Sequence, residues 1–418
     1  MKKKKFIIIS IIAIILIIAI TLGIVFFFSP NSPKKKVIYK VRPKDETSQG
    51  ESSDDSDNGD TDNGDTDNGA KEPDTQEIGA GMLKKVTSNK LGEDYYNVSF
   101  DFEHPGVVGL DAHYVLNVTD KMGNTFLSTD YTLKCDNKSV KIDGAELTVP
   151  YEVRQSGKSI TITVANKNYP NRTGTYQVTF PKFYEKPTFE DDCDFLDLKK
   201  WPTNWYDGSR YPVAENGKYV FRMQDHTQTG FEMATAGYFK QSYGCFSSRI
   251  KVGKSAPCNC AFWMCTDTDA GDMYLYNEEA PRQSGGEIDI IEYYPAWKDR
   301  YATTMHWNGW SDYHRSSGKE PSTNGVDLGD DYHIYSAVWT DSAIYYYLDE
   351  NLTFVCDEKG SVGKNAGPMH LLLQFSHDTS LKDGDIVSWG EFPYRYEDFP
   401  DAMYVDWVRA YQFDSLIE

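Results

Sequence analysis

Gly285–Tyr294 reads GGEIDIIEYY, and the rest of the C-terminal half can be interpreted outward from this stretch. Its isoleucines indicate a β-strand, although Asp and Glu are depleted in strands. Residues two apart share a face of a strand, so Glu287 and Asp289 point the same way. Glu292 is out of phase by one residue, and a β-bulge at Ile290–Ile291 would return it to that face. The stretch therefore predicts three acids on one wall of a groove.

Carboxyl groups placed in this way suit one kind of chemistry. Retaining glycoside hydrolysis needs two carboxyls roughly 5–5.5 Å apart, one as nucleophile and one as general acid/base. Past the bulge, Glu287 and Glu292 lie about four strand steps apart, roughly 13 Å along the backbone, and long side chains on a concave sheet close most of that gap. Asp289 between them would hydrogen-bond one Glu and separate the two pKa values. The alternative is a solvated strand face with incidental charges.

Glu287–Glu292 resembles the signature of glycoside hydrolase family 16, in the bulged form of its laminarinase-like (endo-β-1,3-glucanase) members. The resemblance covers roughly Phe183–Gln412, and it is carried in the family's order by Ser242–Lys251, Ala261–Met264, Met305–Trp307 and Met403–Tyr411. It implies an all-β, two-sheet β-jelly roll of the concanavalin A-like kind. It also implies Glu287 as nucleophile, Glu292 as acid/base and Asp289 as the residue that orients and tunes them. No redox or organic cofactor is required.

Sugar rings present apolar faces that aromatic side chains can contact. The aromatic candidates are Trp205, Tyr206, Tyr211, Trp263, Tyr274, Tyr276, Trp297, Trp307, Trp310 and Trp389. The resemblance ranks Trp263 and Trp307 first, because the matching strands flank the acids, and Trp205 next. His306 is expected to bond the acid/base or the sugar, with a structural histidine as the alternative. Gln374 and Arg249 are further expected sugar contacts.

Many members of the family hold a structural Ca²⁺ far from the cleft, and the resemblance suggests where one would lie here. Asp406 matches the Asp of the final strand, while Glu190 and Gly217 lie near the other ligand positions. Glu190–Asp194 reads EDDCD, which departs from the family's usual pattern. A strand residue bound to solvent or to a neighbour is the alternative for Asp406.

The N-terminus predicts a membrane anchor. Four lysines precede Phe6–Phe28, a charge-free and largely apolar run of 23 residues, which is long enough to span a bilayer as a helix. No small-residue cleavage site follows it, which favours an uncleaved signal anchor over a cleaved signal peptide. Basic residues flank both ends, so orientation is inferred from the downstream sequons, at Asn97, Asn117, Asn137, Asn171 and Asn351. They favour a glycoprotein with its C-terminal domains outside the cytoplasm.

Four parts follow from composition. Residues 1–28 are the lysine cluster and anchor. Residues 29–78 are an acidic linker in which DNGDT repeats every five residues. Residues 79–182 show short alternating runs separated by turn residues, which predict an immunoglobulin-like β-sandwich. Residues 183–418 carry the predicted jelly roll.

The net charge limits the kinds of binding partner, and the cysteine count limits the possible disulfides. A net charge of −20 disfavours nucleic acid and suits an uncharged polysaccharide. Seven cysteines leave at least one outside any intrachain disulfide, and sequence does not decide the pairing.

The sequence thus predicts a membrane-anchored endo-acting hydrolase of β-glucan, with β-1,3 linkages expected before mixed β-1,3-1,4 linkages. A cell-wall transglycosylase on the same scaffold is one alternative, because a sugar hydroxyl can replace water in the second step. A non-catalytic glucan-binding lectin is the other, although a lectin needs no converging carboxylates.

Overall fold

The computed structural model describes residues 87–90, 95–104, 106–204, 210–228, 230–254, 258–266, 276–277, 285–358, 367–377, 379–386 and 393–417. The chain divides into two compact units, residues 1–67 and 68–418, and every described residue belongs to the second. The predicted anchor and linker, residues 1–78, lie outside the described residues. Among the residues described, no helix is both long and apolar enough to cross a membrane.

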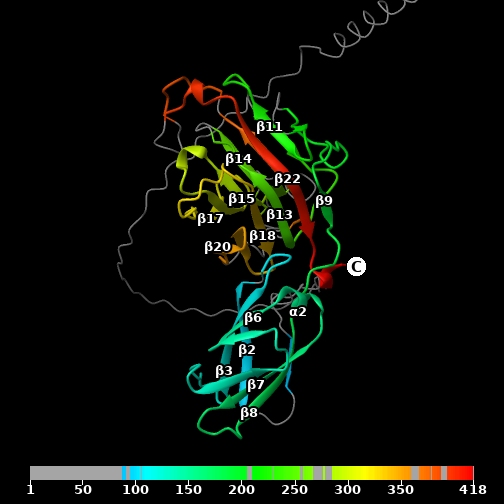
Figure 1. Cartoon of the computed structure of the whole chain (residues 1–418), viewed down its shortest axis with the longest axis vertical. Helices are drawn as coiled ribbons and strands as arrows, with labels where there is room; N and C mark the ends of the chain where they lie inside the picture. The colour runs from blue at the N-terminus through cyan, green and yellow to red at the C-terminus, as the bar shows by residue number, and fades with distance from the viewer. Residues whose placement is uncertain are drawn as a thin grey trace, which may run out of the picture. The chain divides into compact units, whose positions relative to one another are not determined.

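The first described part is a pair of four-stranded antiparallel sheets (Figure 1). One sheet has the order β1 (Thr87–Lys90), β8 (Thr173–Thr179), β7 (Ile160–Asn166), β4 (Tyr131–Cys135), and the other β2 (Tyr96–His104), β3 (Ala112–Asp120), β6 (Glu146–Val149), β5 (Lys141–Asp143). A short helix, α2 (Tyr151–Gln155), follows β6.

Alternation along these strands builds the core of this part. In β3 every second residue from Ala112 to Val118 is buried, as expected for a strand with one face inward. Tyr114 and Leu116 share a hydrophobic cluster with Ile162 and Val178 from the other sheet. The strands predicted between residues 79 and 182 are confirmed, and the immunoglobulin-like topology stays a prediction.

The second described part consists of two larger antiparallel sheets (Figure 1). The eight-stranded sheet has the order β10 (Val213–Ala214), β11 (Tyr219–Met223), β22 (Asp401–Tyr411), β13 (Gly244–Lys251), β18 (His333–Trp339), β19 (Ile344–Leu348), β20 (Asn351–Cys356), with β9 (Phe189–Asp191) paired to β22. The six-stranded sheet has the order β12 (Gly230–Ala234), β21 (Met369–Ser376), β14 (Asn259–Thr266), β15 (Glu287–Tyr293), β16 (Ala302–Trp307), β17 (Arg315–Lys319). Three 3₁₀ turns complete this part: η2 (Pro295–Trp297), η3 (Tyr396–Asp398) and η4 (Asp414–Leu416).

One hydrophobic core lies between these two sheets. Phe246 and Val405 of the eight-stranded sheet belong to the same cluster as Phe262, Ile288 and Leu371 of the six-stranded sheet. Each of these strands therefore has a face committed to the core and a second face free for other contacts. The predicted all-β class and two-sheet architecture are confirmed.

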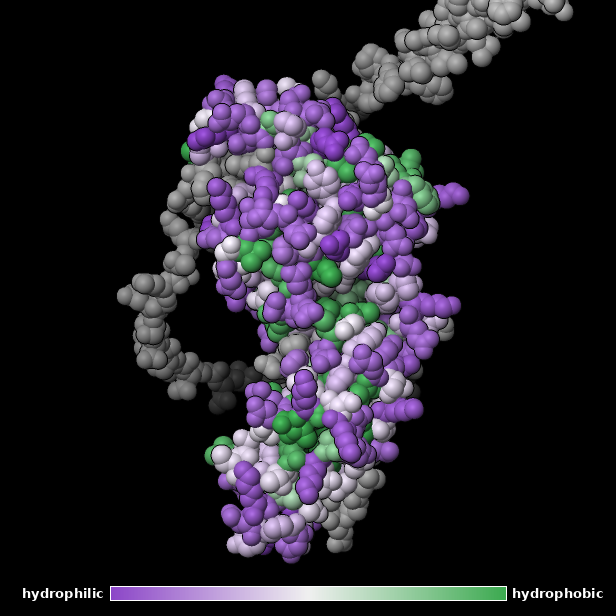
Figure 2. All heavy atoms as spheres, in the orientation of Figure 1, coloured by the Kyte–Doolittle hydropathy of each residue, from purple (hydrophilic) through white to green (hydrophobic). Residues whose placement is uncertain are grey.

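The outer surface is largely hydrophilic, and most of the cysteines are buried. The face of the molecule in Figure 2 is largely hydrophilic, with hydrophobic residues scattered over it. The seven cysteines all lie among the described residues, where none of them forms a disulfide and six are buried. Burial raises the pKa of the Cys258 and Cys260 thiols well above the ordinary value, so these two side chains behave as small apolar core residues.

Candidate active site

The predicted bulge is present in β15. Its pairing with β14 sets Glu287 opposite Cys265, Asp289 opposite Trp263 and Glu292 opposite Ala261. The register shifts between Asp289 and Glu292, so three residue steps along β15 pair with only two along β14. Positions 261, 263 and 265 share one face, and the three acids therefore share it too. The other face of β15 places Ile288 in the core between the sheets.

Glu287 is the more enclosed of the two glutamates. Its side chain is 8% exposed, and the indole Nε1 of Trp310 donates a hydrogen bond to its Oε2 at 2.6 Å. Burial raises the pKa of Glu287 to about 8, and the charge of Asp289 adds to the rise. His306 and the Trp310 hydrogen bond act in the opposite direction, because each favours the ionised carboxylate.

Asp289 is the first member of a contact chain that continues through two histidines. Its Oδ2 lies 3.0 Å from Nε2 of His306, a close polar contact between two buried side chains. His306 Nδ1 in turn lies 3.0 Å from Nε2 of His314. The ring of Trp310 stacks on His314 with centroids 4.3 Å apart, so the partner of Glu287 and the partners of Asp289 pack together. One ligand atom from each of Glu287, Asp289 and His306 lies within 4.8 Å of the others.

Glu292 occupies a more open position. It is half-buried, and Tyr294 donates a hydroxyl hydrogen bond to its Oε1 at 3.1 Å. The amide of Asn259 donates to that same hydroxyl oxygen at 2.9 Å, which leaves the Tyr294 proton free to point at the carboxylate. The two glutamates thus share a face but differ in burial and in hydrogen-bond donors. Unlike environments of this kind are what separate an acid from a nucleophile.

Several other predicted side chains lie on this same face. Trp263 is cross-strand from Asp289 and packs in an apolar cluster with Ala234, Ala261, Cys265 and Leu372. Gln374 of β21 lies opposite Ala261 and is half-buried. His306 lies opposite Glu287 on β16. The structure therefore brings Trp263, His306 and Gln374 together with the three acids.

Trp307 and Arg249 do not reach the acids, and these two predictions are corrected. Trp307 follows His306 on β16, so it points to the opposite face and belongs to the core between the sheets. Arg249 lies on β13 of the other sheet, where its Nη1 is 2.6 Å from Asp406 Oδ2 and its guanidinium packs on the Tyr332 ring. Trp205 lies outside the described residues.

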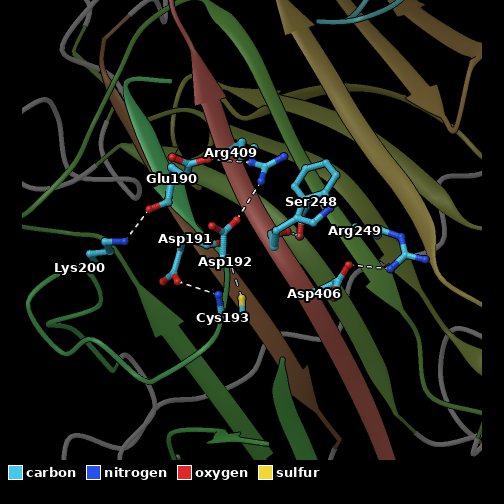
Figure 3. Close-up of polar contacts among 10 residues, drawn as sticks. Glu190, Asp191, Asp192, Cys193, Lys200, Ser248, Arg249, Asp406 and Arg409 are labelled. Carbon is cyan, nitrogen blue, oxygen red and sulfur yellow. Dashed lines mark hydrogen bonds and ion pairs between the residues drawn. The ribbon is translucent and has the colours of Figure 1, made fainter. Parts of the chain in front are cut away.

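The predicted Ca²⁺ position is filled by side-chain cations (Figure 3). Asp406 is paired with Arg249, and Glu190 is paired through its carboxylate with Arg409 at 3.2 Å. The backbone oxygen of Glu190 accepts a hydrogen bond from Lys200 Nζ at 2.6 Å. Gly217 lies in the turn before β11 with a φ of +71°.

The other carboxylates next to Glu190 also have ion-pair or hydrogen-bond partners. Asp192 also binds Arg409, at 2.9 Å, as Figure 3 shows. Asp191 accepts from the Cys193 backbone N–H, the Trp201 indole and the Tyr219 hydroxyl. A divalent cation needs oxygen ligands with free lone pairs, and three positive side chains already occupy this place. The residues present do not fit a Ca²⁺ site.

Sequence reasoning did not select His314, Tyr294 or Asn259, and it did not rank Trp310 above the other aromatic candidates. Trp310 stands among ten aromatic candidates, and only the loop after β16 brings its indole to Glu287. His314 is eight residues beyond His306 and lies at the end of the loop between β16 and β17, so no single strand or helix links the two histidines. Tyr294 lies two residues after Glu292 in sequence, which is the one local signal for it. At the end of β15 this spacing brings the Tyr294 hydroxyl into contact with the Glu292 carboxylate.

The sequence profile described as "Glycosyl hydrolases family 16" matches residues 200–376, which include all three acids. Among curated proteins, the chain is similar to the clotting factor G alpha subunit of Tachypleus tridentatus, with 29% identity over 207 residues, 48% of this chain and 28% of that protein. It is also similar to glucan endo-1,3-beta-glucosidase A1 of Niallia circulans, with 27% identity over 139 residues, covering 31% of this chain and 19% of that protein. The beta-glucanase of Rhodothermus marinus is 23% identical over 195 residues, 44% of this chain and 63% of that protein. The chain thus spans less than two thirds of the length of each of these relatives.

Solved structures include similar chains. The catalytic domain of an endo-1,3-beta-glucanase (laminarinase) from Thermotoga petrophila aligns with a TM-score of 0.44 and 20% identity, over 56% of this chain and 99% of that one. The laminarinase catalytic domain from Thermotoga maritima aligns with a TM-score of 0.42 and 22% identity, over 54% and 98%. The family match over residues 200–376 encloses the acids whose geometry is described above. Residues 200–376 of the chain therefore match glycosyl hydrolases family 16.

Proposed function

We propose that this chain is an endo-acting β-glucan hydrolase that works by a retaining double displacement. The observation that carries the proposal is the bulged strand, which sets Glu287, Asp289 and Glu292 on one face with unlike surroundings for the two glutamates. The curated names of two relatives, an endo-1,3-beta-glucosidase and a beta-glucanase, favour β-glucan as the substrate class.

In the first step, the Glu287 carboxylate attacks the anomeric carbon while the Glu292 carboxylic acid protonates the departing sugar oxygen. This gives a glycosyl-enzyme ester on Glu287. In the second step, Glu292 removes a proton from water, and the water oxygen displaces Glu287 at the same carbon. Two inversions give net retention.

The productive protonation state has Glu287 ionised and Glu292 protonated. Burial alone favours the reverse, since it raises the pKa of Glu287 to about 8. The Trp310 N–H and the His306 imidazole oppose burial by stabilising the Glu287 carboxylate. We propose that these two residues favour the form in which the proton is on Glu292. Asp289 would hold His306 in place.

The test uses the full chain with β-1,3-glucan and, separately, mixed-linkage β-glucan. New reducing ends are counted, product sizes are measured, and the anomeric configuration of the first product is read by proton NMR before it mutarotates. Glu287→Gln is compared with Glu190→Gln, a matched change on β9 outside this face. We expect β-configured products from wild type and Glu190→Gln, and none from Glu287→Gln.

Other outcomes separate the alternatives. α-Configured first products would contradict retention. Longer oligosaccharides without a net gain in reducing ends would show transglycosylation. Glucan binding without any product, in wild type as in Glu287→Gln, would favour a lectin.

The anchor and the location belong to this proposal as well. The charge-free run Phe6–Phe28 supports attachment to the membrane, with the hydrolase domain outside the cytoplasm. Carbonate extraction of membranes from expressing cells tests the attachment. External protease digestion of intact cells tests the orientation, since only an exterior domain is cleaved.

A further inference from the structure

A pocket on the outer face of the eight-stranded sheet has no part in the proposed chemistry. Its volume is about 390 Å³, which is within the usual range of small-molecule sites. The residues that line it are Glu215, Asn216, Lys218, Val220, Arg222, Lys251, Tyr332 and Tyr404. Two tyrosines and three cations therefore surround one cavity.

Three neighbouring strands supply the floor of this pocket, and Figure 1 shows them running through the sheet. Tyr404 of β22 lies opposite Val220 of β11 on one side and opposite Lys251 of β13 on the other. Directly opposed residues share a face, so these three side chains form one row. Their neighbours along the strands belong to the core between the sheets: Tyr219, Phe221, Ile250, Met403 and Val405. The row therefore faces outward, on the opposite side of that core from the three acids.

A tight hairpin between β10 and β11 forms one wall of the pocket. Asn216 and Gly217 have φ of +54° and +71°, and the backbone N–H of Glu215 donates to the carbonyl of Lys218 at 2.9 Å. A two-residue turn with positive φ at both positions is of the I′ kind, for which Asn-Gly is a favoured sequence. The turn fixes the backbone from which Glu215, Asn216 and Lys218 reach the cavity. This wall is therefore formed before a ligand arrives.

The pocket has an excess of positive charge on an acidic chain. Its one carboxylate, Glu215, is paired with Arg222, with Oε2 and Nη2 3.5 Å apart. Lys218 and Lys251 form no ion pair with any carboxylate in the described ranges, and Lys251 Nζ donates to the backbone oxygen of Asp330 at 3.1 Å. Two lysines without a carboxylate partner, on a chain of net charge −20, favour an anionic ligand at this place.

Tyr332 and Tyr404 give the pocket flat surfaces. Both side chains are half-buried, so each ring is supported by the protein and still reaches the cavity. The Tyr332 ring is held by two cations, with its centre 5.5 Å from Lys218 Nζ and 4.5 Å from the guanidinium carbon of Arg249. Tyrosine rings contact the apolar faces of sugars, and their hydroxyl groups hydrogen-bond to sugar hydroxyls. Rings and lysines together suit a sugar that carries a negative charge.

We propose that this pocket binds a sugar unit with an acidic group, such as a hexuronate. Lys218 and Lys251 bind the carboxylate through charge-assisted hydrogen bonds, Tyr332 and Tyr404 contact the ring, and the Asn216 amide bonds a hydroxyl. Because the pocket and the three acids lie on opposite sides of the core, both can be occupied at once. The pocket would thus hold the protein on an acidic polysaccharide while the other face acts on β-glucan.

The test is equilibrium binding to the full chain, followed by ligand-observed NMR. The two ligands are methyl β-glucopyranosiduronate and methyl β-glucopyranoside, which differ only at the carboxylate. We expect the acidic glycoside to bind and the neutral one not to bind. The double variant Lys218→Ala with Lys251→Ala should weaken binding at least about tenfold, as for a lost hydrogen bond to a charged group. Tyr404→Leu should weaken it about 2- to 10-fold, as for a lost ring contact.

The control removes the same charge elsewhere. Lys134→Ala with Lys141→Ala changes two exposed lysines of the first described part and should leave binding unchanged. Neither double variant should alter the release of reducing ends from β-1,3-glucan, since no changed residue lies on the face of the acids.

Several results would overturn the proposal. The neutral glycoside binding as tightly as the acidic one would remove the charge requirement. Acetate competing as well as the acidic glycoside would show a site for any carboxylate. An equal loss in the control variant would show non-specific attraction, and no binding of the acidic glycoside to wild type would leave no site. If wild type cleaves no glucan, the proposed hydrolysis fails, whereas the binding result is unaffected.

Discussion

The indole of Trp310 offers the sharpest test of how the proton is divided between the two glutamates. Its N–H donates to Glu287 at 2.6 Å, and a Trp310→Phe change removes this donor while keeping an aromatic ring. A hydrogen bond to a charged group contributes about 1.5–3 kcal/mol. Because 1.36 kcal/mol corresponds to one pKa unit, losing it should raise the pKa of Glu287 by roughly 1–2 units above its value of about 8.

The kinetic consequence follows from the coupling of the pair. In the proposed mechanism only the form with Glu287 ionised and Glu292 protonated reacts, so a proton held on Glu287 gives an unreactive form. Moving the proton toward Glu287 lowers the population of that form. The plateau of kcat/KM should fall about 10- to 100-fold, and the alkaline limb, where the pair loses its last proton, should move to higher pH.

The assay is kcat/KM on a soluble β-1,3-glucan from pH 5 to pH 10, for wild type, Trp310→Phe and Trp307→Phe. Trp307 is the matched control, because it lies in the core and makes no contact with Glu287 in the described structure. We expect Trp307→Phe to lower stability and leave both limbs in place. A lower plateau for Trp310→Phe with an unmoved alkaline limb would refute the reasoning, since Trp310 would then act only through packing or substrate contact.

Three further outcomes can be measured on the same protein. His314→Ala should lower kcat about fivefold by releasing His306, as for one lost hydrogen bond, and an unchanged kcat would show that Asp289 alone holds His306. Glu232→Gln should leave the free energy of unfolding unchanged near pH 5 and raise it by up to about 5 kcal/mol at pH 9. The reason is that the folded pKa of Glu232, about 8, lies above its unfolded value, so that burial of the charge costs stability as pH rises from about 4.5 through 8. Urea unfolding at both pH values checks this, and equal gains at both would contradict it. EDTA should leave Tm unchanged, and a fall in Tm with EDTA that Ca²⁺ reverses would contradict the ion-pair assignment. Arg249→Gln should lower the free energy of unfolding by no more than about 1 kcal/mol, since the Arg249–Asp406 pair is part-exposed.

Much of the fold and the grouping of the three acids on one face was predictable from local sequence. The alternation along β3 and β15 identifies strands, because side chains on a strand alternate between faces whatever the strand pairs with. The bulge at Ile290–Ile291 follows from the same rule, since three acids cannot share a face without one extra residue. Trp263 was placed through the matching strand expected to flank the acids, and β14 does pair with β15. Gln374 was named only as a possible sugar contact, and its position on β21 comes from the structure.

The remaining site residues depended on contacts between segments that are distant or irregular in sequence. A one-residue step along β16 sends Trp307 into the core, whereas Trp310 returns from the loop to Glu287, and no local pattern ranks one above the other. Arg249 and Asp406 meet only because β13 and β22 are neighbours in the eight-stranded sheet, and their pairing replaces the predicted cation. Val220 and Tyr404 are distant in sequence and become neighbours only through the register of β11 with β22. Strand periodicity is a property of the backbone and can be seen in the sequence, whereas strand order, register and loop closure set burial and partners and are decided by the tertiary structure alone.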